Sequence, residues 1–258
     1  MTFNLHTHTY RCHHARGTDE EYVLRAIENG YKTIGFSDHA PYIFPGDYYS
    51  TFRIERSSAQ EYADSVRALQ EKYKGTIDIR LGFEVEWYPA LIQEELAYLK
   101  SFGYDYLLLG QHHVDNEYEP WESYSGSPTA SLTVLDKYID QVLAAADSGE
   151  FAYIAHPDLI HFTGNRDIYL QKMEAMLQTL KTLDIPIEFN FLGFTDKRHY
   201  PADDFWQLAA GVGNRVVIGL DAHRPAVYAD TKHLSEMKAK IASFGITPIQ
   251  NVNEILQK

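Results

Sequence analysis

Histidine and carboxylate residues recur in short, closely spaced groups along this chain. Most of its twelve histidines belong to such groups instead of being scattered. In the pair His6 and His8 the two imidazoles lie two residues apart, so on a strand they face the same side and can bind one ion. Asp221 and His223 repeat this spacing with a carboxylate in place of one imidazole. These residue types at this spacing predict the binding of divalent metal ions.

Each group has a simpler explanation when it is taken alone. An HxH pair is more often a surface or core pair of histidines, Asp221 could cap a turn, and a buried Glu84 could belong to a structural ion pair. As a set they favour metal ligands, because a buried charge needs a partner and a cation supplies one. Imidazole and carboxylate without thiolate suit Zn, Mn or Fe better than Ca, and so many ligands imply two to three ions. Cys12 is expected to be a free thiol.

Short apolar runs alternate with stretches of helical period and predict seven βα units. The expected strands are Thr2–His6, Thr33–Ser37, Ile77–Phe83, Tyr104–Gly110, Phe151–His156, Pro186–Asn190 and Arg215–Leu220. The expected helices are Asp19–Asn29, Ser57–Tyr73, Pro89–Ser101, Leu132–Ser148, Asp167–Leu183, Ala202–Ala210 and Thr231–Phe244. Strands joined by helices of this length pair in parallel. Without GxGxxG, GxxxxGKS/T or a linker-like stretch, we predict one α/β domain over residues 1–258, a closed or nearly closed barrel.

Each expected strand carries a metal-competent group at or just beyond its C-terminal end, where barrel enzymes build their active sites. In chain order these groups are His6 with His8, Asp38 with His39, Glu84 with Glu86, His112 with His113, His156, Asn190, and Asp221 with His223. Seven such coincidences are hard to obtain by chance. We therefore expect these side chains to meet at one mouth of the barrel.

Composition limits the kinds of partner that the chain can have. A net charge of −13 argues against broad, charge-driven binding of nucleic acid. No apolar run reaches the ~20 residues that a membrane helix needs, and the N-terminus lacks the order of a signal peptide. The single cysteine excludes an internal disulfide framework and fits a reducing compartment. We expect a cytoplasmic enzyme that acts on a small molecule and has neither nucleic-acid nor membrane partners.

The ordered motifs HTHT, SDH, GFE, GQHHV, AHP and LDAH resemble those of the polymerase and histidinol phosphatase (PHP) family. The resemblance runs from His6 to His223, and GFSDHAP and DAHRP are similar to its histidinol-phosphatase branch. It implies a distorted (β/α)7 TIM-like barrel that holds a trinuclear metal centre. It also implies hydrolysis of L-histidinol phosphate in histidine biosynthesis, through metal-activated attack of water on phosphorus.

Carried over position by position, the resemblance implies a full set of metal ligands. The first ion would be bound by His6, His8, Glu84 and Asp221, the second by Glu84, His113 and His156, and the third by His14, His39 and His223. His14 is preferred to His13, and His113 to His112, because each matches the family's position better. One departure is Asn4, where many members carry Asp, so a carboxylate that would raise ligand basicity is missing there.

Two residues are expected to act on the phosphate group. Asp221, central in the ligand set, is the candidate for orienting the nucleophile, and either it or a metal-bound water could protonate the leaving alkoxide. Arg198, after the sixth strand, is the best candidate for binding phosphate, because a guanidinium matches phosphate with two hydrogen bonds. Arg166 and Arg224 are weaker candidates. Arg198 could instead be a solvated surface residue, and Arg224 could simply anchor its turn.

Histidinol carries an ammonium group and an imidazole but no carboxylate, so its pocket should be acidic and aromatic. The stretches VDNEYEPWESY and PYIFPGDYY have this character. They suggest Glu117 or Glu119, with Trp121 or Tyr42, as residues that select a cationic substrate. Solvated acidic loops are the simpler explanation for such runs.

Three other functions remain open. The nearest is another phosphoesterase of the same family, such as a nucleotide phosphatase, a nuclease or a phosphotyrosine phosphatase. A non-catalytic metal-binding scaffold should have lost ligands, whereas every expected position is filled here. An amidohydrolase on a similar barrel would need a lysine at a strand end, and no expected strand ends in a suitable one.

Overall fold

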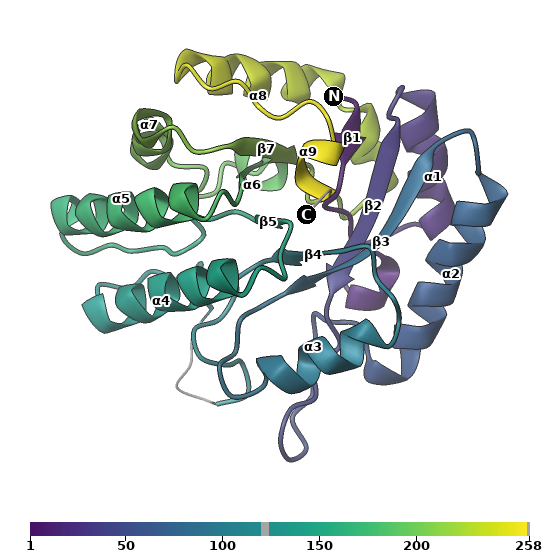
Figure 1. The fold of residues 1–258 in the computed structure, drawn as a ribbon, viewed down its shortest axis with the longest axis horizontal. Coiled ribbons are helices and arrows are strands. Elements are labelled where there is room, and N and C mark those ends of the chain that lie inside the picture. Colours follow the sequence, from purple (N-terminus) through teal and green to yellow (C-terminus); the bar gives the residue numbers. More distant parts are fainter. Residues whose placement is uncertain (120–123, 257–258) are drawn as a thin grey trace.

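The fold is built on one sheet of seven parallel strands. The computed structural model describes residues 1–119 and 124–256, and it orders the strands from β1 to β7 as they occur in the chain. The strands are β1 Phe3–Asn4, β2 Thr33–His39, β3 Asp78–Val85, β4 Tyr106–Leu109, β5 Tyr153–Ile154, β6 Ile187–Asn190 and β7 Val216–Gly219. Because consecutive strands are parallel neighbours, each connection must cross over the outside of the sheet, and Figure 1 shows the long helices there.

The seven expected helices are present, with bounds that shift by a few residues. They are α1 Asp19–Glu28, α2 Ala59–Lys72, α3 Ile92–Lys100, α4 Leu132–Ser148, α5 Arg166–Thr182, α7 Asp203–Val212 and α8 Thr231–Ser243. The sequence did not predict the short helices α6 Phe191–Thr195 and α9 Asn253–Leu256, or the 3-10 turns η1 Tyr10–Cys12, η2 Arg56–Ser58 and η3 Pro225–Ala229. In the described part of the chain, no helix has the length and apolar character to span a bilayer.

The first and last strands meet just beyond their C-terminal ends. The backbone N–H of His8 donates to the carbonyl of Ala222 at 3.0 Å, and the N–H of Ala222 donates to the carbonyl of His6 at 3.1 Å. These bonds form a parallel bridge between Thr7 and Ala222. The barrel is therefore closed at the mouth where the sequence places the metal-competent residues.

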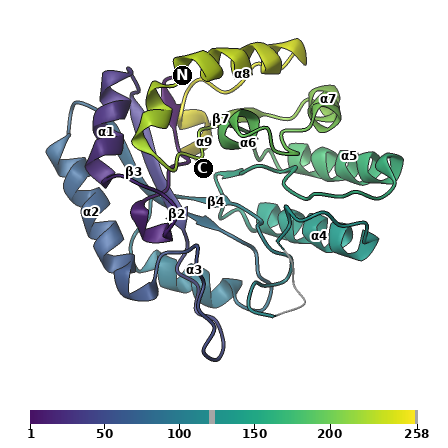
Figure 2. The same ribbon diagram turned by 180° about the vertical axis from the view of Figure 1, so that it is seen from behind.

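The opposite end of the barrel interior is filled with apolar side chains. This barrel floor consists of Phe3, Leu5, Tyr106, Leu108, Tyr153, Val217 and Ile255. Ile255 comes from α9, which lies in front of the strands in Figure 1 and behind them in Figure 2. Gly35 and Gly82 leave the space that the ring of Tyr106 fills, since a Cβ at either position would collide with it. The floor is thus packed, and only the mouth is left for chemistry.

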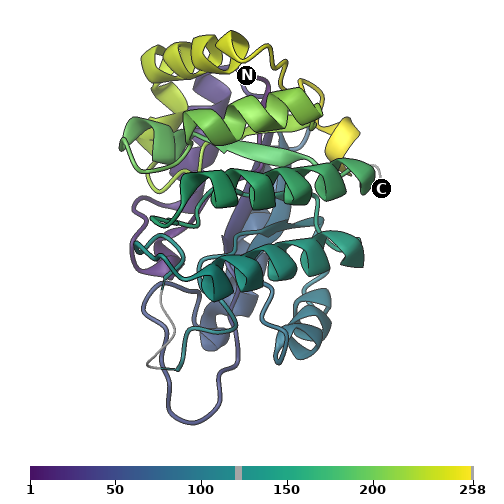
Figure 3. The ribbon, with the colours of Figure 1, turned by 90° about the vertical axis from the view of Figure 1, so that its left-hand side faces the viewer.

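A second apolar core lies between the outer face of the sheet and the helices. Outward-facing residues such as Phe36, Leu107 and Ile218 belong to it, together with Trp206 of α7. At the mouth, the loop formed by residues 40–55 extends away from the stacked helices (Figure 3). This loop and the other strand-to-helix connections form the rim of the site.

Candidate metal centre

Glu84, at the C-terminal end of β3, is the centre of a buried cluster of imidazoles. Its Oε1 lies 3.0 Å from Nε2 of His156 and 3.5 Å from Nε2 of His6. Its Oε2 lies 3.1 Å from Nδ1 of His39 and 3.5 Å from Nε2 of His8. The ends of three other strands thus converge on one carboxylate of β3, as the strand-end pattern predicts.

The surroundings of Glu84 fit a carboxylate that bridges cations. The side chain is fully buried, and within residues 1–119 and 124–256 no group forms a hydrogen bond with Oε2. Gly110 faces it, and a Cβ there would collide with the carboxylate. Burial raises the pKa of Glu84, but the imidazoles of His112, His6 and His39 outweigh burial and hold the pKa well below its usual range. A buried ionised carboxylate with an open oxygen needs a cation.

The imidazole nitrogens of the mouth also converge in pairs. Nε2 of His6 lies 3.1 Å from Nε2 of His8, and Nε2 of His14 lies 2.9 Å from Nε2 of His223. Asp221 joins the first pair, with Oδ1 3.1 Å from Nε2 of His8. Two nitrogens bound tetrahedrally to one zinc ion would lie about 3.4 Å apart, so these separations fit shared cations.

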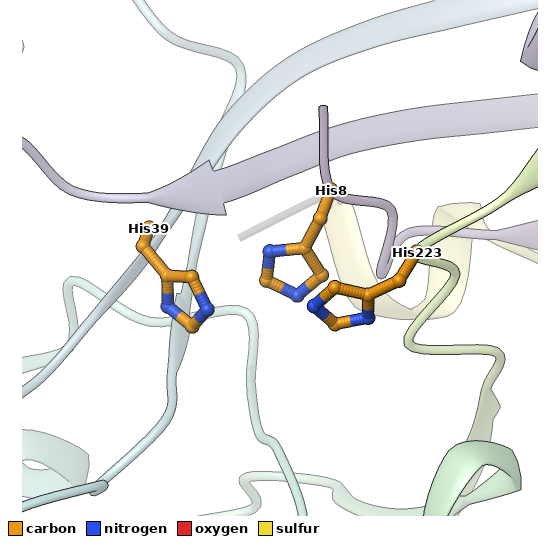
Figure 4. Close-up of side chains that lie close together, drawn as sticks. All are labelled: His8, His39 and His223. Atoms are coloured by element: carbon orange, nitrogen blue, oxygen red, sulfur yellow. The ribbon is translucent and has the colours of Figure 1, made fainter. Parts of the chain in front are cut away.

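His8, His39 and His223 form a further group of potential ligands. One nitrogen of each lies within 4.8 Å of a nitrogen of the others, and Figure 4 shows the three rings gathered from β2 and from the segments after β1 and β7. Cys12 lies close by, but its thiol donates to the carbonyl of Thr9 at 3.1 Å, and burial raises the pKa of the thiol. The buried thiol thus has a hydrogen-bond acceptor of its own beside the imidazoles.

Hydrogen bonds at Nδ1 orient four of these imidazoles. The partners are Glu188 for His6 at 2.8 Å, Asp38 for His8 at 3.3 Å, the carbonyl of Cys12 for His14 at 2.7 Å, and the carbonyl of Asp221 for His223 at 3.0 Å. A carboxylate or carbonyl at Nδ1 places the proton there and leaves the lone pair of Nε2 directed at the cluster. The rings are therefore held in the tautomer that binds metal.

Sequence reasoning missed Glu188, which lies inside β6 and is fully buried. Its Oε1 accepts a hydrogen bond from Nδ2 of Asn190 at 2.6 Å, and Gly219 leaves room for the carboxylate. The available signal was its position two residues before Asn190, because alternate residues of a strand face the same side. Glu188 supplies His6 with a carboxylate partner, whereas Asn4 binds the hydroxyl of Tyr228 at 2.8 Å. The departure at Asn4 therefore does not leave His6 without an acidic partner.

His112, and not the expected His113, lies beside Glu84. Nε2 of His112 is 3.7 Å from Oε1 of Glu84, and its Nδ1 is 2.8 Å from Oε1 of Glu86. His113 instead stacks on Phe52 with ring centroids 5.7 Å apart, and burial lowers its pKa to about 4. The exchange follows from a turn after β4, in which the N–H of His112 donates to the carbonyl of Gly110 at 3.0 Å.

A cavity of about 480 Å³ opens over the cluster. It is lined by His14, His39, His112, His156, Asp221 and His223 on the metal side, and by Thr51, Phe52, His113, Tyr124, Leu192, Arg198 and Tyr200 on the other side. Arg198 donates to the hydroxyl of Tyr200 at 3.0 Å and pairs with Asp196 at 3.2 Å. The structure thus brings Arg198 to the cavity. Arg224 borders a larger adjoining cavity of about 850 Å³.

Three other expected substrate contacts lie away from the cavity lining. Arg166 pairs with Asp204, with Nε 2.7 Å from Oδ2, between α5 and α7. Tyr42 is buried and donates to the backbone carbonyl of Glu86. Glu117 is buried against a guanidinium, because a carboxylate in an apolar setting takes the nearest cation as its partner.

The last two expected contacts are Glu119 and Trp121. Glu119 accepts a hydrogen bond from Nδ2 of Asn116 at 2.9 Å and does not belong to the cavity lining. Trp121 lies outside the described residues. Among the described residues, the aromatic side chains of the cavity lining are Phe52, Tyr124 and Tyr200, and the expected Tyr42 does not belong to it.

Comparisons with known proteins show the family and the fold. The model of the PHP domain family matches residues 4–191. A probable histidinol-phosphatase of Deinococcus radiodurans is 31% identical over 227 residues, which cover 85% of each chain. A probable histidinol-phosphatase of Schizosaccharomyces pombe is 28% identical and covers 96% of this chain and 89% of its own. The crystal structure of histidinol phosphate phosphatase from Lactococcus lactis, complexed with zinc, L-histidinol and phosphate, has a TM-score of 0.73 at 19% identity and covers 96% of this chain and 95% of its own. This likeness confirms the distorted barrel.

Proposed function

The chain belongs to the PHP domain family, and from this premise we propose that it is a metal-dependent phosphatase that hydrolyses L-histidinol phosphate. One observation carries the proposal: Glu84 is buried, and its open oxygen faces imidazoles beneath a cavity with an arginine in its wall. Similarity to the probable histidinol-phosphatases of Deinococcus radiodurans and Schizosaccharomyces pombe supports the choice of substrate.

We assign the metal ligands to the residues that converge at the mouth. They are His6, His8, His14, His39, Glu84, His112, His156, Asp221 and His223, with His112 replacing His113. Two or three divalent ions, of Zn, Mn or Fe, suit this set of nitrogen and oxygen donors. Bound there, they would supply Lewis acidity and lower the pKa of a coordinated water.

Asp221 is placed to orient the attacking water. The N–H of Gly193 donates to Oδ1 of Asn190 at 2.7 Å, so Nδ2 of Asn190 must face Oδ2 of Asp221, 3.2 Å away. Burial raises the pKa of Asp221, but the imidazoles of His6 and His8 outweigh burial and hold the pKa well below its usual range. Asp221 is therefore ionised at neutral pH and can accept a hydrogen bond from water.

The opposite wall of the cavity suits the two ends of the substrate. Arg198 is held by Tyr200 and Asp196, and its guanidinium can bind two oxygens of the phosphate. The rings of Phe52, Tyr124 and Tyr200 offer flat faces to the imidazole of histidinol and negative π-surfaces to its ammonium group. Anion and cation would thus be bound by different residues of the same wall.

Phosphate release tests this proposal directly. The protein is stripped with a chelator, reloaded with Zn²⁺, Mn²⁺ or Fe²⁺, and assayed with L-histidinol phosphate, a nucleoside monophosphate and phosphotyrosine. We expect activity to vanish without metal, and kcat/KM to favour histidinol phosphate by about 100-fold or more, since a site built for polar groups rejects analogues that lack them. Preference for another ester would reassign the substrate, and no release with metal bound would contradict the proposal.

Arginine variants test the placement of the phosphate. Arg198→Ala should raise KM sharply while the metal content stays unchanged, because the guanidinium touches the substrate and none of the ligands. Arg166→Ala is the matched control, since Arg166 pairs with Asp204 outside the cavity. Unaltered kinetics in Arg198→Ala would remove this residue from the substrate site.

A further inference from the structure

Arg53 is a buried guanidinium at the point where three rim segments meet. It is 2% exposed and lies in the loop 40–55 after β2. Its Nη1 is 2.7 Å from Oε2 of Glu86, just beyond β3. Its Nε donates to Oε2 of Glu117 at 2.8 Å, in the connection after β4. One side chain therefore ties together the segments that follow β2, β3 and β4.

The first arm of Arg53 leads to the metal centre. Glu86 is fully buried, and while Oε2 contacts Arg53, Oε1 is 2.8 Å from Nδ1 of His112. Nε2 of His112 in turn lies 3.7 Å from Oε1 of Glu84. Glu86 thus has the position of a carboxylate that orients a metal-binding imidazole and raises its basicity. Arg53 holds that carboxylate in place from the side opposite the imidazole.

The second arm leads to the wall of the substrate cavity. Thr51 and Phe52, the residues just before Arg53, line the cavity, and Phe52 stacks on His113 of the connection after β4. Glu117 belongs to this same connection and has its side chain fully buried against Arg53. The ion pair therefore joins two of the rim segments that build this wall.

The charges of this group show why it needs a guanidinium. One cation faces two buried carboxylates, and the ring of Phe52 covers it at 4.5 Å while the ring of Tyr42 covers it at 5.2 Å. Water cannot screen the group, so each carboxylate needs a cation in direct contact. The planar fork of arginine can serve both at once, whereas lysine offers a single point charge.

We propose that Arg53 is a positioning residue that couples the metal centre to the substrate cavity. With one arm it holds Glu86 against His112, and with the other it holds the connection after β4 through Glu117, so that a ligand and the cavity wall keep one relative placement. The inference rests on the proposed metal-dependent hydrolysis. Its two arms predict different measurable effects, which a merely structural ion pair would not produce.

Three variants of the full chain separate the arms. Glu86→Gln should weaken Zn²⁺ binding about 10- to 100-fold and shift the visible absorption bands of the Co²⁺-loaded protein, with KM for histidinol phosphate nearly unchanged once metal is saturating. Glu117→Gln should raise KM several-fold and leave Zn²⁺ affinity within about twofold, because Glu86 keeps its partner. Arg53→Lys should show both effects.

The readouts are metal competition against a chelating dye, Co²⁺ absorption and steady-state kinetics, all measured below the melting temperature. Arg166→Gln is the control, because it removes an ion pair to Asp204 outside the site and should leave every readout unchanged. If Arg53→Lys lowers only the melting temperature and keeps wild-type metal affinity, spectrum and KM, the proposal is wrong.

Two further outcomes are decisive. If Arg53→Lys does not fold, the other two variants test the proposal. Wild-type Zn²⁺ affinity in Glu86→Gln, or a wild-type KM in Glu117→Gln, overturns the coupling. If the wild-type protein binds Zn²⁺ and Co²⁺ but hydrolyses no histidinol phosphate, the proposed function fails instead, while the metal readouts of Glu86→Gln and Arg53→Lys still test the first arm.

Discussion

The mouth and the floor of the barrel are built by the same strands and have opposite chemistry. On β3, Gly82 faces the ring of Tyr106 at the floor, and Glu84, two residues further along, faces the imidazoles of the mouth. The paired residues of β6 and β7 show the same contrast. Glu188 of β6 points inward to His6, whereas its neighbour Val217 of β7 points inward to the apolar floor. The alternation of side chains along each strand is kept throughout, and only the residue type changes.

This difference separates the tasks of the two regions. Burial of apolar side chains at the floor stabilises the fold by about 25 cal/mol per Å² removed from water. Burial of carboxylates and imidazoles at the mouth destabilises it unless cations or hydrogen bonds compensate. Substitutions at the mouth should therefore abolish activity with little loss of stability. Substitutions at the floor should lower the stability and leave the activity of the folded protein unchanged.

The largest expected effect is that of Asp221→Asn on activity. Asparagine has the same shape and tolerates the positive φ of 49° at this position, so the backbone should not change. Loss of the carboxylate removes both a metal ligand and the group that orients water, and kcat/KM should fall by about 10²–10⁴-fold. The carboxylate also stabilises the metal-free fold at neutral pH, because its pKa lies well below its usual range, so urea unfolding should show a loss of stability that is smaller than that of a core truncation. A variant that keeps a tenth of the activity, or that loses as much stability as a core truncation, would contradict the separation.

Leu108→Ala tests the floor on a strand that also serves the mouth. Leu108 is fully buried between Tyr106 and the end of β4, and its truncation should cost about 2–5 kcal/mol in the free energy of unfolding. Below the melting temperature kcat and KM should stay at wild-type values. The exposed Leu24, at 43%, is the matched control, and Leu24→Ala should change stability by about 0.5 kcal/mol or less. An equal loss of stability in both variants would mean that the floor does not stabilise the fold more than an exposed leucine does.

Glu188→Gln tests whether a buried carboxylate behind a ligand belongs to the mouth or to the fold. The amide can still hydrogen-bond to Nδ1 of His6, but without its charge His6 is a weaker ligand, and Zn²⁺ affinity should fall about 10- to 100-fold. With metal at saturation, kcat should recover most of its value. Competition with a chelating dye gives the affinity, and wild-type affinity in the variant would assign Glu188 to the fold alone.

The regular part of the fold was predictable because its signals are local. The period of α4 and the glycine after it, Gly149 with φ 71°, give the same bounds in the sequence and in the structure. The closing helix α9 was not predictable, since it has four residues and its placement depends on Ile255 reaching a floor that other strands build. Elements that are defined by distant contacts leave little trace in their own residues.

The same distinction applies to the site. His6, Glu84 and Asp221 were predictable because strand ends of a parallel barrel must meet, whatever the details of packing. The exchange of His112 for His113 was not, because one turn after Gly110 decides which imidazole faces Glu84. Composition suggested that Glu117 binds substrate, but its partner is Arg53, a residue 64 positions away that no local pattern connects to it.

The smallest expected effect concerns a buried glutamate outside the mouth, which can be compared with Glu84 inside it. Glu95 of α3 is 2% exposed, and within residues 1–119 and 124–256 its Oε1 has no hydrogen-bond partner. Burial raises its pKa to about 8, whereas imidazoles hold that of Glu84 well below its usual range. Because folded Glu95 binds its proton more tightly than the unfolded chain does, its contribution to stability is full below about pH 4.5 and is lost as pH rises towards 8.

Glu95→Gln should remove this dependence. The stability of the wild-type protein relative to the variant should decline by about 2 kcal/mol between pH 6 and pH 8, since one pKa unit corresponds to roughly 1.4 kcal/mol. Melting temperatures of both proteins across this range provide the measurement, and phosphate release should be equal in the two, because Glu95 touches none of the ligands. A difference in melting temperature that stays constant with pH would show that Glu95 is ionised in the folded protein. In that case a cation must reach the carboxylate of Glu95. The difference in protonation between Glu84 at the mouth and Glu95 on α3 would then be smaller than the pKa values indicate.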